Sequence, residues 1–194
     1  MPTEFQIETP RLLLRAWRDE DRAPFAAINA DPEVMRYFAG PLTAAETDET
    51  IDRYNTQLVR DGFTMFTVEE RETHTLAGVL GMQTMRIAVP NLPQPSVEIG
   101  WRLALAAQGR GLATEGARAI IDHAFNTLGL PQVVAITTPS NQPSRKVMEK
   151  LHMTHRPELT FIHPNVPADH RLQPHVLYSL TNPVRPEALC STPS

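Results

Sequence analysis

The stretch QGRGLATEG, residues 108–116, contains the residue types that can bind phosphate. It lies between an apolar run typical of a strand and a long segment whose apolar residues recur at helical spacing. The first turn of a helix presents unpaired backbone N–H groups and the positive end of the helix dipole, and glycine leaves that backbone uncovered. The stretch therefore predicts a pyrophosphate site at the start of a helix, with Arg110 as a further donor. A flexible strand-to-helix turn without a ligand would use the same residues.

Two known phosphate motifs do not fit this stretch. No Gly-Lys-Ser/Thr follows it, as a Walker loop requires, and the third glycine of a dinucleotide-binding fingerprint is missing. The pyrophosphate interpretation therefore depends on the rest of the chain.

Histidines near the end of the chain are a second group that could do chemistry. His163 and His175 lie in FIHPNVPADHRLQPHVLY, and a neutral imidazole can accept a proton or contact a substrate. Their alternative role is structural, as parts of a loop and a strand. We expect no metal site, because the histidine spacings are irregular and no cysteine or acidic partner is in register.

The elements that would position these residues alternate between strands and helices. Strands are expected at residues 11–17, 63–70, 74–85, 96–105, 132–137, 159–164 and 175–180. Helices are expected at residues 19–31, 43–62, 111–128 and 141–153, with a further helical turn at 31–38. A strand, a crossover helix and an apolar strand predict a right-handed parallel pair, whereas the hairpins predict antiparallel neighbours. A parallel pair in a mixed sheet lets a ligand enter at the carboxyl end of a strand.

Composition narrows the class of protein. The 194 residues are 41% hydrophobic and 21% charged with a net charge of −4, which argues against a nucleic acid or an anionic membrane as partner. The single cysteine, Cys190, excludes an internal disulfide framework. Charges interrupt any signal peptide at the N-terminus, and no run approaches the roughly 20 apolar residues of a membrane span. We expect a cytoplasmic protein with one domain over residues 1–182 and a flexible tail over 183–194.

The stretch VEIGWRLALAAQGRGLATEGARAIIDHAF, residues 97–125, resembles the acetyl-CoA-binding core of the GNAT superfamily of N-acetyltransferases. That family's phosphate loop, Gln/Arg-x-x-Gly-x-Gly/Ala, is matched by Gln108, Gly111 and Ala113. The segments TPRLLLRAWRDED, DPEVMRYFAGPLT and NQPSRKVMEKLHM are similar to the branch that acetylates N-terminal alanines of ribosomal proteins, which also includes small-molecule acetyltransferases.

The resemblance implies a fold and a set of acetyl-CoA contacts. The fold would be a mixed α/β, mostly antiparallel, twisted sheet of about seven strands with about four flanking helices. A central parallel pair, strands 97–103 and 133–137, would splay apart to admit the pantetheine arm. The residues expected to contact the acetyl donor are Ile99, Gly100, Trp101, Gln108, Gly109, Arg110, Gly111, Leu112, Ala113, Thr114, Asn141 and Arg145.

The resemblance also implies direct attack of a neutral amine on the thioester, with no acyl-enzyme. A lysine-like amine, with a pKa of about 10.4, is mostly protonated at neutral pH and needs a base. Glu98 is the first choice, although a histidine, water or a merely solvent-facing Glu98 remain alternatives. Ser144 would protonate or hydrogen-bond the departing thiolate, because Met148 stands where many GNAT enzymes have a tyrosine. A thiolate that leaves without such help is the alternative. Asn141 would also cap the last helix.

The acceptor side carries weaker signals. Phe38, His163 and His175 are candidates to contact the acceptor, with core or cleft wall as the alternative for Phe38. Acidic residues that could favour a cationic acceptor are Glu46, Asp48, Glu49 and Asp52. A second departure from the family is His152, where the family usually has a glycine after the helix.

The function expected from these observations is acetyl-CoA-dependent N-acetylation of a primary amine, either a protein N-terminus or a small molecule. The alternative is a catalytically silent acyl-CoA-binding regulatory module, which the missing tyrosine at Met148 favours. The sequence leaves both a monomer and a homodimer open.

Overall fold

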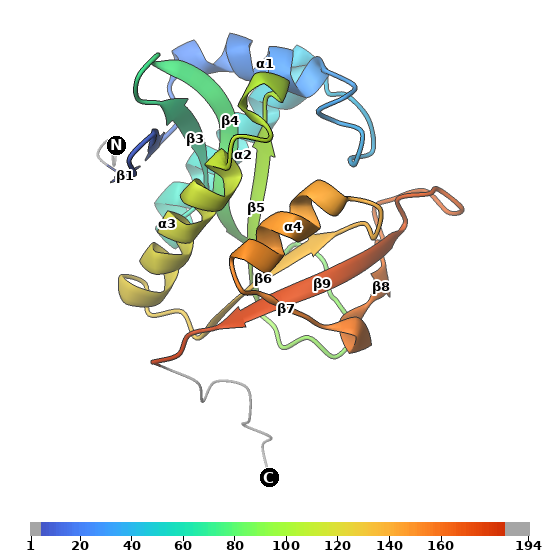
Figure 1. Ribbon diagram of the computed structural model, residues 1–194. Helices are drawn as coiled ribbons and strands as arrows, with labels where there is room; N and C mark the ends of the chain where they lie inside the picture. The colour runs from blue at the N-terminus through green and yellow to red at the C-terminus, as the bar shows by residue number, and fades with distance from the viewer. Residues whose placement is uncertain (1–4, 185–194) are drawn as a thin grey trace. The chain divides into compact units, whose positions relative to one another are not determined.

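The computed structural model of the protein describes residues 5–184 (Figure 1). The chain divides into two compact units. The first unit comprises the described residues of Met1–Gln83 and Gly100–Ala119, and the second those of Thr84–Ile99 and Ile120–Ser194. The division falls within β5 (Val97–Leu103), within the helix α3 (Leu112–Asn126) and before the last residue of β4 (Thr75–Thr84).

The strands of the first unit follow the order β1-β2-β3-β4-β5. Their bounds are Gln6–Glu8 for β1, Leu12–Arg15 for β2, Met65–Glu70 for β3 and Thr75–Thr84 for β4. The first four strands pair antiparallel in the places that apolar alternation predicts, except that the short β1 was not foreseen. A Cβ at Gly78 of β4 would lie 2.2 Å from the carbonyl oxygen of Arg102, so only glycine lets β4 and β5 approach this closely.

Two helices of the first unit supply its core. These are α1 (Arg22–Ala30) and α2 (Ala44–Asp61), which bury Phe25, Ile51 and Tyr54 against Trp17. The capping box predicted for α2 is confirmed, because Thr43 and Glu46 exchange side chain-to-backbone hydrogen bonds. Gly62 ends the helix in the left-handed conformation with a φ of 76°.

The further helical turn predicted at residues 31–38 forms as a single turn and does not continue as a helix. Asp31 does accept the backbone N–H groups of Glu33 and Val34, as a helix cap would. The segment then makes separate turns rather than a continuous ladder, because Met35 bonds back to Asp31 while Phe38 bonds back to Met35.

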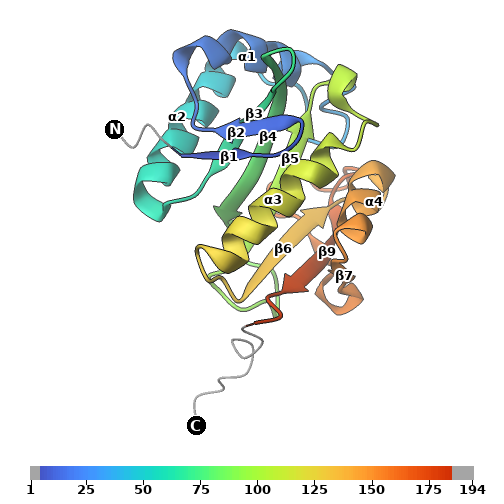
Figure 2. The same ribbon diagram turned by 60° about the vertical axis from the view of Figure 1, so that its left-hand side comes forward.

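The second unit is built around strand β9. The start of β5 pairs parallel with β6 (Gln132–Thr137), and β6 pairs antiparallel with β9 (Pro174–Thr181). Two short strands, β7 (Thr154–His155) and β8 (Phe161–Ile162), also pair with β9. Helix α4 (Gln142–Lys150) lies beside β6, as Figure 2 shows. Val89, Val134, Phe161 and Leu177 contribute to the core of this unit.

The expected fold class is confirmed. The strands are mostly antiparallel, β5 and β6 form the parallel pair, and residues 5–184 contain four α-helices. The parallel ladder has one register pair, Glu98 opposite Val134. Nine strands are present in that range, and the two that the sequence did not predict, β1 and β7, are only three and two residues long. No helix among the described residues has both the length and the apolar character needed to cross a membrane.

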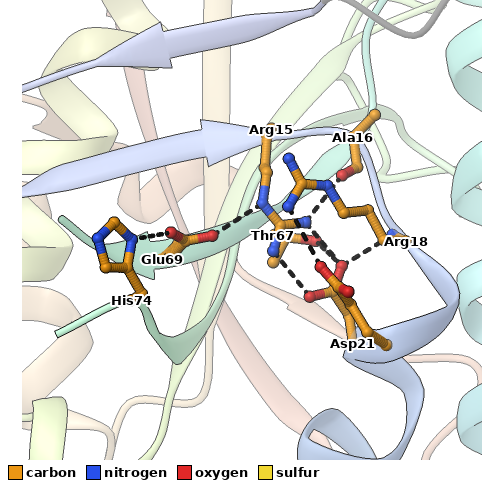
Figure 3. A network of polar contacts seen from close by, with 8 residues as sticks. Arg15, Ala16, Arg18, Asp21, Thr67, Glu69 and His74 are labelled. Carbon is orange, nitrogen blue, oxygen red and sulfur yellow. Dashed lines mark hydrogen bonds and ion pairs between the residues drawn. The ribbon is translucent and has the colours of Figure 1, made fainter.

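A buried ion network joins three elements of the first unit (Figure 3). The Arg15 guanidinium donates to both carboxylate oxygens of Asp21, at 2.7 and 2.9 Å, and to Glu69 at 3.0 Å. The three side chains are only 8%, 4% and 11% exposed. Burial alone would lower the pKa of Arg15, but the two carboxylates raise it overall. Burial would raise the pKa of Glu69, but hydrogen bonds from His74 and Arg15 lower it.

We expect Asp21→Asn to lower the free energy of unfolding by about 3 kcal/mol or more, because it leaves the buried Arg15 charge half-compensated. Urea unfolding of the variant and the parent measures this. Asp19→Asn is the matched control, since the Asp19 side chain is fully exposed and its ion pair with Arg22 contributes little. Equal effects of the two substitutions would show that burial does not govern the network.

Candidate active site

The glycine-rich stretch forms an exposed loop that leads into α3 in the first unit. Gly109 and Gly111 have φ angles of 73° and 80°, the region that favours glycine. A Cβ at Gly109 would meet no atom within 4 Å, and one at Gly111 would meet only the Arg11 guanidinium at 3.7 Å. Within the described chain, no backbone N–H of residues 109–114 has a hydrogen-bond acceptor, and the first intrahelical bond runs from Glu115 to Gly111. These N–H groups are free to hold an anion.

Arg11 and Glu115 hold this loop in place. The Glu115 carboxylate accepts the Thr9 hydroxyl at 2.6 Å, the Arg11 backbone N–H at 2.9 Å and Arg11 Nε at 2.7 Å. Burial would raise the pKa of Glu115, but these hydrogen bonds lower it, so the carboxylate stays charged. Arg11 also donates to the carbonyl of Arg110 at 3.0 Å, which fixes the orientation of the loop peptide. Sequence analysis did not identify this pair, whose members are 104 residues apart.

The side chains of the loop make contacts within the first unit. Gln108 donates to the carbonyl of Leu103 at 2.9 Å, where it ties the loop to the end of β5. Arg110, the predicted phosphate donor, instead makes a two-point ion pair with Glu70 at 2.7 and 2.6 Å. Leu112 is buried at the start of α3, whereas Ala113 and Thr114 are half-buried.

The predicted contacts on β5 fall in both units. Ile99 is buried and Glu98 half-buried in the second unit, where Glu98 is in register with Val134 of β6. Gly100 and Trp101 belong to the first unit and are half-buried.

Asn141 and Ser144 come together at the start of α4. Asn141 Oδ1 accepts the Ser144 backbone N–H at 3.2 Å, which confirms the predicted cap. Asn141 Nδ2 donates to Thr137 Oγ1 at 2.9 Å and to Ser144 Oγ at 3.1 Å. Because Ser144 Oγ accepts this bond, its own hydroxyl proton is available to another acceptor. Met148 is buried and cannot donate a proton in its place.

Arg145 follows Ser144 on α4 and uses its guanidinium within the second unit. Its Nε donates to the Tyr178 hydroxyl at 3.0 Å and its Nη1 donates to the carbonyl of Pro139 at 3.2 Å. After the helix, His152 takes a φ of 59°, the conformation that glycine usually fills there.

His163 and His175 lie together in the second unit, with ring centroids 4.6 Å apart. Burial lowers the pKa of both, so both are neutral at pH 7. His163 Nδ1 accepts the Asn165 N–H, and His175 Nδ1 lies 3.3 Å from the carbonyl of Gln173, to which it can only donate. His175 therefore presents Nε2 as an acceptor, and His163 presents Nε2–H as a donor.

The remaining candidates are on the first unit or outside the described residues. Phe38 is 40% exposed and lies over the Arg102 guanidinium. Across residues 5–184 no three metal-ligating side chains gather into a site. Cys190 and most of the predicted tail lie outside the described residues.

Comparison with known proteins places the chain in a family. The family model for the acetyltransferase (GNAT) domain matches residues 11–154, so the chain belongs to the GNAT acetyltransferases. YkkB of Bacillus subtilis is 30% identical over 154 residues, which cover 79% of this chain and 87% of YkkB. This family uses acetyl-CoA as its acetyl donor, and the chain is an N-acetyltransferase by membership.

Solved structures show the same fold. A GNAT-family acetyltransferase from Bacillus anthracis aligns with a TM-score of 0.76 at 23% identity, over 92% of this chain and 99% of that one. Spermidine N-acetyltransferase from Vibrio cholerae, solved with CoA and spermine, aligns with a TM-score of 0.69 at 19% identity, over 90% and 97%. At these identities the likeness shows the fold alone.

Residues 109–114 suit the diphosphate of coenzyme A, because their N–H groups are free and glycines keep the backbone open. We expect Gly111→Ala to weaken binding of coenzyme A at least tenfold, since a methyl group would stand where the phosphate approaches. Isothermal titration measures the dissociation constant.

Gly62→Ala is the matched control for this substitution. Gly62 has a similar φ of 76°, and a Cβ there would meet no atom within 4 Å, so the two variants carry similar backbone strain. A loss of affinity in both variants, or in neither, would count against a phosphate site at the loop.

Proposed function

We propose that the protein acetylates a primary amine by direct attack in a ternary complex with acetyl-CoA. The observation that carries this proposal is the set of free backbone N–H groups at residues 109–114, which Arg11 and Glu115 hold open. Membership of the GNAT family supports acetyl transfer, and the absence of a cysteine from residues 5–184 supports a route without an acyl-enzyme. Both a protein N-terminus and a small molecule are acceptors of the proposed class, and we propose that the enzyme works in the cytoplasm.

Proton transfer in this proposal involves two side chains of the second unit. The neutral amine nitrogen bonds to the thioester carbonyl carbon, the carbon–sulfur bond breaks, and the sulfur leaves with the electron pair. Glu98 accepts the proton that the amine must lose, directly or through a water. Ser144 Oγ–H donates to the leaving sulfur, because Asn141 already satisfies the oxygen as an acceptor. His175 Nε2 is the alternative base.

A melting experiment followed by an activity assay tests the proposed function. We expect acetyl-CoA and CoA to raise the melting temperature, because both bind the native state at residues 109–114. Thiol release with a panel of primary amines should then be detected for at least one acceptor. Stabilisation without turnover on any amine would identify a catalytically silent binding module instead, and no stabilisation would contradict both functions.

The role of Glu98 has its own test. We expect Glu98→Gln to lower kcat/KM by about 10²–10⁴-fold, the usual contribution of a positioned base. The loss should be largest at low pH, where most of the amine is protonated, and should shrink as pH rises toward the amine pKa. Glu149→Gln, on the exposed face of α4, is the matched control. An unchanged pH–rate profile in Glu98→Gln would assign the base to another group, with His175 tested next.

A further inference from the structure

Arg102 of β5 is a cation without a carboxylate partner. Its Nη1 donates to Asn29 Oδ1 and contacts the sulfur of Met35, and its guanidinium lies over the rings of Phe25 and Phe38. No Asp or Glu in residues 5–184 forms an ion pair with it. Its Nε is buried and has no hydrogen-bond acceptor. All of these residues belong to the first unit.

Other arginines of the first unit differ from Arg102, because carboxylates bind them. Arg15, which is buried, is bound by two carboxylates, and the half-buried Arg22 is bound by three, Asp19, Asp48 and Asp52. A buried polar group without a partner costs stability, and a buried charge costs more. Burial is the main cause of a lowered pKa at Arg102; Tyr54 raises this pKa and Arg53 lowers it.

The surroundings of Arg102 add positive charge and aromatic rings. Arg53 lies over the Tyr54 ring at 5.5 Å, and its guanidinium donates to Thr50 rather than to a carboxylate. Of the acidic residues expected to favour a cationic acceptor, Glu46 caps α2 while Asp48 and Asp52 bind Arg22. Among the described residues, none of these carboxylates forms an ion pair with Arg102 or Arg53.

The edge of the Arg102 guanidinium that Asn29 leaves unoccupied is complementary to a carboxylate. Since Asn29 occupies Nη1, the Nε–H and an Nη2–H remain side by side, and two parallel N–H donors match the two oxygens of a carboxylate. Phe38 is the exposed member of the cluster, and the Arg102 guanidinium lies over its ring, 4.6 Å from the centroid.

We propose that Arg102, positioned by Asn29 and covered by Phe38, binds a carboxylate of the acceptor, so that the acceptor is an amine that also carries an acidic group. This inference rests on the proposed function and specifies the substrate class. The other source of an oxyanion is a phosphate of coenzyme A. The diphosphate loop has different neighbours, Arg11 and Glu70, whereas Arg102 contacts α1 and the 31–38 turns.

The test uses amine pairs that differ only in the carboxylate, namely free amino acids and their carboxamides. Dissociation constants are measured by calorimetry on the full chain saturated with CoA, and acetyl transfer is measured separately. We expect at least one free acid to bind about tenfold or more tightly than its amide, the usual size of a charge-assisted pair of hydrogen bonds. Arg102→Gln should reduce that ratio to about one, and Arg60→Gln, on the exposed end of α2, should leave it unchanged.

A second variant keeps the proposal testable if Arg102→Gln does not fold. Asn29→Asp is nearly isosteric and gives Arg102 a carboxylate of its own, so it should keep the melting temperature while lowering the acid-to-amide ratio. In both variants the dissociation constant for CoA should stay within twofold of the parent. A ratio of one in the parent, or a ratio unaffected by both substitutions, would overturn the proposal. A rise in the CoA dissociation constant with Arg102→Gln would overturn it in favour of a cofactor phosphate. Carboxylate preference without acetyl transfer would confirm the anion site and contradict the proposed function.

Discussion

Backbone N–H groups that are left without acceptors at residues 109–114 are the constraint on which the rest of the structure depends. Leaving them open to solvent costs little, but the loop must be kept from closing on itself. Positive φ angles at Gly109 and Gly111 set its shape, and the Arg11–Glu115 pair fixes the first turn of α3 against the start of β2. The loop proposed to bind the diphosphate is thus held by contacts between segments that are far apart in sequence.

Charge placement in the first unit follows one rule with one exception. Enclosed cations are matched to carboxylates, as Arg15 is to Asp21 and Glu69, because an isolated buried charge is costly. Arg102 breaks the rule, and proteins tend to depart from local optimality where function requires it. In the second unit, a hydroxyl group at the start of α4 is also only partly satisfied. Asn141 donates to the Ser144 oxygen, but the Ser144 hydroxyl proton remains available for donation.

Sequence patterns predicted correctly those features that depend on residues close together in the chain. The Thr43–Glu46 capping box, the Asn141 cap and the glycine-rich loop each depend on residues within a few positions of one another, and each was found as expected. The two missed strands, β1 and β7, are too short to show alternation and form only because a neighbouring strand pairs with them. The 31–38 segment stops after a single helical turn, from Asp31 to Met35.

The sequence predicted only part of the candidate site, because several of its contacts join residues that are far apart in the chain. Arg110 matched the phosphate donor by position, but its ion pair with Glu70 depends on the fold. The roles of Arg11, Glu115 and Arg102 depend on contacts across 104 and 73 residues, and no local pattern indicates them.

A crystal structure of the protein with coenzyme A tests the central claim most directly. The account predicts diphosphate oxygens within hydrogen-bonding distance of the backbone nitrogens of residues 109–114, with the Arg11–Glu115 pair intact. A diphosphate bound elsewhere, with those nitrogens bonded to protein or water alone, would contradict it.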